Sequence, residues 1–149
     1  MSVNIAETFE LLLDKNNNVA YKALQLLQKE SEERNCVYPY MHRLSDMLDS
    51  ENSYIRTRGL TLLAYNAKWD KDNKIDEIID KYLEHITDVK PITARQCIKL
   101  LPIVAKYKPD LKNDILSALH KANISIYGDS MQSLVHKDIQ KVLNEIQNL

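Results

Sequence analysis

The sequence predicts an all-α fold, a short right-handed α–α superhelix of about eight helices in four antiparallel pairs. Three observations lead to this prediction. Apolar residues recur at spacings of three and four, as on one face of an α-helix. The 149 residues include only 2 glycines, whereas β-rich folds need several for their hairpins. A segment of the chain also repeats at intervals close to 40 residues, which is typical of stacked helical pairs.

The helical spacing runs through almost the whole chain. In the clearest case, Ile75, Ile79, Tyr82 and Ile86 fall on one face of a helix. Ser, Asn, Asp and Pro separate the apolar stretches and mark helix starts. We therefore expect eight helices, at residues 3–14, 17–33, 38–49, 53–69, 73–87, 91–107, 109–121 and 129–147.

Two places depart from this pattern. Pro102 lies inside the helix expected at residues 91–107 and should kink it, because proline lacks an N–H and crowds the preceding turn. The apolar spacing of the last expected helix slips at His136–Asp138, and a break is expected there.

The internal repeat is clearest in the second helix of each pair. Three segments share the pattern, at offsets of 36 and then 38: residues 19–27, 55–63 and 93–101. Ala23, Gly59 and Cys97 occupy the same column of this alignment. A small side chain there would let paired helices approach closely. We therefore interpret Gly59 and Cys97 as packing residues, and Cys97 not as a nucleophile.

These residues resemble the second helix of a HEAT repeat, which typically reads as a β-branched residue, Arg, two variable positions, a small residue and leucines. Ile55-Arg56-Thr57-Arg58-Gly59-Leu60 matches this pattern, while the other copies have Ala20 and Ala94 in place of the arginine. The resemblance covers about residues 17–122. It implies an armadillo-like α-solenoid without a particular activity. Because the family's motif arginine usually braces neighbouring repeats, the resemblance also implies a structural role for Arg56.

Composition limits the classes of function. A net charge of -1 argues against a dedicated nucleic-acid binder. No stretch approaches the roughly 18 apolar residues of a membrane span, so no membrane partner is expected. The first residues are acidic rather than basic, which predicts no signal peptide. Cys36 and Cys97 have no metal-site spacing and are interpreted as free thiols in the cytoplasm.

No catalytic, cofactor-binding or metal-binding residue is expected. The four histidines lack the spacing of a helical metal site. Gly128-Asp129-Ser130-Met131 resembles the nucleophile block of the GDSL hydrolases, but it lies late in the chain and follows no strand. Asp129 or Ser130 is therefore interpreted as a helix N-cap. An enzyme whose site is built from scattered residues stays open as an alternative.

The repeat alignment predicts a binding surface. In a solenoid each repeat contributes one helix to a continuous concave strip, and the outward positions of the second helices carry cations and tyrosines. The predicted residues are Lys22, Lys29, Tyr54, Arg58, Tyr65, Lys68, Lys99 and Lys106. Such a strip would steer an acidic partner by charge and anchor it on the tyrosines. An ordinary solvated face is the other interpretation.

The leading hypothesis is a non-enzymatic scaffold, one domain over residues 1–149, that binds an acidic protein partner through this strip. Nucleic-acid binding by the same strip is the alternative. It includes the DNA glycosylases with HEAT-like folds, for which Trp69, Tyr65 and Arg58 would be candidates although the catalytic acid of that family does not align. The oligomeric state is open, since the apolar residues Phe9 and Leu11–Leu13 suit either a core or an interface.

Overall fold

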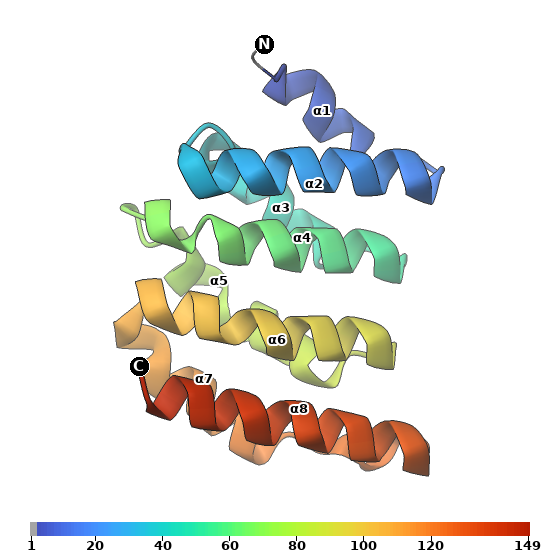
Figure 1. Ribbon diagram of the computed structural model, residues 1–149, viewed down its shortest axis with the longest axis vertical. Coiled ribbons are helices and arrows are strands. Elements are labelled where there is room, and N and C mark those ends of the chain that lie inside the picture. Colours follow the sequence, from blue (N-terminus) through green and yellow to red (C-terminus); the bar gives the residue numbers. More distant parts are fainter. Residues whose placement is uncertain (1–2) are drawn as a thin grey trace. The chain divides into compact units, whose positions relative to one another are not determined.

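The computed structural model describes residues 3–149, and its regular structure is entirely helical (Figure 1). Within these residues eight α-helices and five short 3-10 segments occur, with no strand. The all-α prediction is therefore confirmed. No helix in the described part of the chain is long and apolar enough to cross a bilayer. The chain packs as two compact units, the first ending at Lys74 and the second running over Ile75–Leu149.

The first unit consists of two helical pairs. Its helices are α1 (Ile5–Leu11), α2 (Asn17–Glu33), α3 (Met41–Met47) and α4 (Ser53–Tyr65). α1 packs on α2, α3 packs on α4, and α2 lies beside α4 (Figure 1). The side-chain oxygens of Asn4, Asn16 and Asn52 accept backbone N–H groups in the first turns of α1, α2 and α4. These caps satisfy N–H groups that a helix leaves unpaired, and so set where the helices begin.

Gly59 lies at the contact between α4 and α3. A Cβ atom on Gly59 would lie 3.0 Å from the Leu44 carbonyl oxygen and 3.0 Å from Met47 Cβ. The close approach of the two helices therefore needs glycine here. The packing role predicted for Gly59 is confirmed, and Ala23 in the same column is also buried.

The second unit continues the pattern with two further pairs. Its helices are α5 (Lys74–Glu84), α6 (Pro91–Tyr107), α7 (Lys112–Lys121) and α8 (Asp129–Gln147). α6 lies beside α8, and α7 packs on α8 (Figure 1). Arg95 Nε in α6 donates a 2.6 Å hydrogen bond to Asp138 Oδ2 in α8. α6 extends through Pro102 as one helix, and the kink expected there stays a prediction.

The break expected near His136–Asp138 does not occur, because α8 is continuous. Val135 and Ile139 are both buried and continue the apolar face across this segment. Asp138, which interrupts the apolar spacing in the sequence, is the acceptor for Arg95. The apparent slip is therefore an interhelical ion pair.

The expected N-cap of α8 is also corrected. The N-cap is Gly128, which contributes no side-chain hydrogen bond. Asp129 instead lies in the first turn, where a carboxylate interacts favourably with the helix dipole.

Candidate interaction surface on the second helices

We name α2, α4, α6 and α8 the second helices, since each completes a helical pair. In the first unit, five of the six predicted surface residues reach solvent. Lys22, Lys29, Tyr54 and Lys68 are exposed, and Tyr65 is half-buried. The outward faces of α2 and α4, with the 3-10 turn Ala67–Trp69 that follows α4, therefore present ammonium and phenol groups, which suit contacts with anionic and extended partners.

Arg58 does not belong to this surface, contrary to the prediction. Its side chain is only 5% exposed. Its Nη1 donates to the Leu12 carbonyl at 2.8 Å, and its Nη2 donates to Asn17 Oδ1 at 3.0 Å. Burial lowers the pKa of the guanidinium, although an arginine stays charged at neutral pH. Arg58 thus lies on the side of α4 that faces α1 and α2, where it ties helices together.

Lys68 is exposed but held in place by its neighbours. Its ammonium donates to the Glu32 carbonyl and lies 4.9 Å from the centre of the Trp69 ring. Trp69 Nε1 in turn donates to the Ser31 carbonyl at 2.7 Å. Glu32 itself is exposed and adds a carboxylate to this end of α2, which the repeat alignment overlooked because it ended at Lys29.

The second unit places both of its predicted residues in solvent and adds two more. Lys99 and Lys106 of α6 are exposed, and so are Lys137 and Lys141 of α8. The lysines of α8 were not predicted because the last helix aligns with no repeat. The signal that could have found them is their i, i+4 spacing on the side of α8 away from its buried residues.

The lysines of α6 and α8 are almost unpaired. Among the described residues, Lys99, Lys106 and Lys137 form no ion pair, while Lys141 lies 4.0 Å from Glu145 Oε1. The only other contact is that of Lys106, 5.2 Å from the centre of the Tyr107 ring. The outward faces of α6 and α8 are therefore cationic, and their charges are available to a partner.

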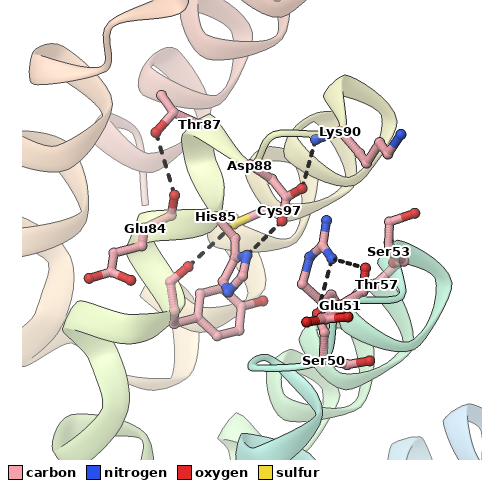
Figure 2. Close-up of polar contacts among 12 residues, drawn as sticks. Ser50, Glu51, Ser53, Thr57, Glu84, His85, Thr87, Asp88, Lys90 and Cys97 are labelled. Atoms are coloured by element: carbon pink, nitrogen blue, oxygen red, sulfur yellow. Dashed lines mark hydrogen bonds and ion pairs between the residues drawn. The ribbon is translucent and has the colours of Figure 1, made fainter.

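A polar cluster closes the turn between α5 and α6. His85 Nδ1 lies 2.7 Å from Asp88 Oδ2, and Asp88 Oδ1 accepts the Lys90 N–H at 2.8 Å (Figure 2). The Tyr127 hydroxyl donates to the Asp88 carbonyl and so joins the segment before α8 to this turn. Burial, assisted by the Asp88 carboxylate, raises the pKa of Tyr127 to about 12. These bonds fix the start of α6, and the cluster therefore has a structural role.

Cys97 lies beside this cluster but is inert. It is 0% exposed, and its thiol donates a 3.7 Å hydrogen bond to the Tyr82 carbonyl (Figure 2). Burial, reinforced by the negative charge of Asp88, raises the pKa of Cys97. A thiol of this kind is neither accessible nor ionised at neutral pH. The interpretation of Cys97 as a packing residue is confirmed by its burial.

Arg56, the residue at the motif arginine position, also has a structural role. Its Nη1 donates to the Ser50 carbonyl at 3.0 Å and to the Glu51 carbonyl at 3.1 Å, which are the free carbonyls between α3 and α4. Its side chain is buried. Elsewhere in the described residues, His, Cys, Asp and Glu side chains form no group of three or more that could hold a metal ion.

Comparison with protein families connects these observations. A family model described as a HEAT repeat domain matches residues 2–144. The chain belongs to the HEAT-repeat family. Comparison with curated proteins and with solved structures found no match. HEAT-repeat domains generally mediate protein interactions, and the family therefore suggests a protein-interaction scaffold.

Proposed function

We propose that this HEAT-repeat protein is a non-enzymatic scaffold that binds an acidic segment of a protein partner through the outward faces of α6 and α8. The observation that supports the proposal is the cationic face of α6 and α8. Lys99, Lys106 and Lys137 are exposed there, and none of them forms an ion pair with another described residue. Among the described residues, the carboxylates of these two helices that form ion pairs are Asp138, which binds Arg95, and Glu145, which lies 4.0 Å from Lys141.

Unpaired lysines on rigid helices suit this function for a physical reason. Their charges attract an acidic segment over about a Debye length, which speeds its association and orients it. The helices hold the attachment points of the side chains at fixed spacings, so little backbone order has to be gained on binding.

The experiment compares two matched double variants of the full chain. Lys99→Glu with Lys106→Glu reverses two charges on the proposed face, and Lys112→Glu with Lys121→Glu reverses two charges on α7 of the same unit. Binding of a fluorescent oligoglutamate peptide is followed by anisotropy. The first variant should weaken binding about ten-fold or more, because two favourable charge contacts become repulsive. The second should leave the dissociation constant nearly unchanged.

Three outcomes would overturn the proposal. Equal losses in both variants would mean that only overall charge matters. If the wild-type chain does not bind oligoglutamate at low salt, the partner is not an acidic segment. Tighter binding of single-stranded DNA than of oligoglutamate, with a steeper salt dependence, would instead assign the surface to nucleic acid.

A further inference from the structure

One side of α4 packs against the first helical pair, α1 and α2. Arg58 on that side donates to Leu12 and Asn17, at the turn between α1 and α2. Leu62 lies one turn further along the same face and is 0% exposed. A cation followed by a leucine four residues later is therefore the pattern with which α4 packs on its neighbours.

The same pattern recurs in α2, where it faces solvent. The repeat offset of 36 places Lys22 at the position of Arg58 and Leu26 at the position of Leu62. Lys22 is exposed and forms no ion pair within residues 3–149, and Leu26 is 46% exposed. Glu33, 11 residues after Lys22, falls on the same face of α2 and is also exposed. We name Lys22, Leu26 and Glu33 the α2 edge.

α1 is too short to cover the α2 edge. With 7 residues it is about 10 Å long, whereas α2 with 17 residues is about 25 Å long. Figure 1 shows α1 beside only part of α2. The end of α1 itself exposes Leu11 and Leu13. The first unit thus leaves partly exposed to solvent a face of α2 whose residue pattern is buried in α4.

We propose that the α2 edge is the interface of a homodimer, in which α2 packs antiparallel to α2 of a second copy of this chain. The order of the charges along the α2 edge supports a second copy of this chain as the partner. A two-fold axis placed midway between Lys22 and Glu33 brings each lysine opposite the glutamate of the other copy. Two ion pairs then form from one patch, which is the self-complementarity that a symmetric dimer requires.

The same axis brings the apolar residues together. Leu26 lies one and a half residues from the midpoint, so the two Leu26 side chains are separated by about 4 to 5 Å along the axis and pack on each other. The ion pairs then flank this contact on both sides. Lys29 lies one and a half residues beyond the midpoint, opposite Leu26 of the other copy. Its methylene groups pack on that leucine while its exposed ammonium extends into solvent. This surface is separate from the lysines of α6 and α8, so either proposal can fail without the other.

Sedimentation equilibrium of the full chain over a range of concentrations tests the dimer. We expect Lys22→Glu and Glu33→Lys each to weaken dimerisation about ten-fold, since each variant replaces two ion pairs by two like-charge contacts. The double variant carrying both changes should restore the wild-type dissociation constant. Lys71→Glu, an exposed charge reversal outside the edge, should have no effect.

A disulfide test gives an independent readout. In a Cys36→Ala background, Leu26→Cys should form an intermolecular disulfide on mild oxidation, whereas Gln25→Cys, on the outward face, should not. A chain that stays monomeric at every concentration would overturn the proposal. So would a dimer that is indifferent to the charge exchange, or one that crosslinks equally through both cysteines. Circular dichroism of each variant shows that the helices are intact.

Discussion

The Arg58 guanidinium meets the Leu12 carbonyl at 2.8 Å, although the two residues are 46 positions apart in the sequence. Leu12 is the C-cap of α1, where a helix leaves its last carbonyls without partners. A second nitrogen of the same guanidinium reaches Asn17 at the start of α2. One side chain of α4 therefore fixes the turn between the two helices of the first pair.

Arg58→Met should lower the free energy of unfolding by about 2 to 3 kcal/mol, because a buried carbonyl and a side-chain amide lose a charged donor. Urea denaturation measures the change. Lys29→Met, an exposed lysine on α2, is the matched control and should stay within about 0.5 kcal/mol of the wild type. The affinity for oligoglutamate should not fall in Arg58→Met, and a fall without a loss of stability would return Arg58 to the binding surface.

Gly59→Ala should destabilise the protein by about 1 kcal/mol. Alanine is favoured over glycine inside a helix by about that amount, but its Cβ would lie 3.0 Å from the backbone oxygen of Leu44, and overpacking costs about 1 to 3 kcal/mol. Thermal unfolding provides the measurement. Gly128→Ala is the control, since nothing lies within 4 Å of a Cβ at that position. If Gly59→Ala were more stable than the wild type, α3 and α4 would be able to move apart enough to admit the Cβ without cost.

Asp76→Asn should destabilise the protein in a pH-dependent way. Asp76 Oδ1 lies 2.8 Å from the ammonium of Lys108, which is almost fully buried. Burial alone would raise the pKa of Asp76, but the hydrogen bonds and charge around it, chiefly from Lys108, lower the pKa below 3.8. Because the folded-state pKa is depressed, the carboxylate stabilises the fold fully above its unfolded-state pKa, and this contribution disappears as the pH falls through the folded-state pKa.

At about pH 7 the variant should therefore lose about 2 kcal/mol, and its stability should converge with that of the wild type in strong acid. Urea titrations at several pH values measure the difference. Asp80→Asn, an exposed carboxylate in the same helix, should show no such trend. A difference that is independent of pH would mean that the carboxylate acts through packing alone.

Thiol reagents should distinguish the two cysteines. Cys36 is half-buried and should react in the native protein, whereas Cys97 is inaccessible and should react only on unfolding. Ellman's reagent should therefore titrate one thiol before urea is added and both afterwards. In Cys36→Ala the native signal should vanish. Rapid labelling of Cys97 in that variant would contradict the packing role assigned to it.

The helices could be located from the sequence because the apolar spacing and the caps are local signals. The ranges expected for α6 and α8 agree with the structure. The helix expected to reach residue 69 ends instead at Tyr65. At Asn66 the side-chain amide donates to Leu62 and to Ser31, so a side chain competes with the helical bonds and a 3-10 turn follows. Long-range bonds of this kind are not visible in a repeat pattern.

The candidate surface was predictable only in part. Apolar spacing shows which side of a helix points inward, and it correctly left lysines such as Lys29 and Lys99 in solvent. It does not show which side faces the neighbouring pair, and for that reason Arg58 was placed on the wrong face. Lys137 and Lys141 were missed because the repeat motif fades in the last helix, although that helix packs like the others.

The hydrogen bond between Trp69 and Ser31 makes the chain a natural fluorescence reporter. Trp69 is the only tryptophan in the sequence, and its indole is bonded within the first unit. Its emission therefore follows the melting of that unit, while far-ultraviolet dichroism follows the helices of both. Coincident transitions by the two signals would mean that the two units unfold cooperatively. Separated transitions would measure the stability of each unit on its own.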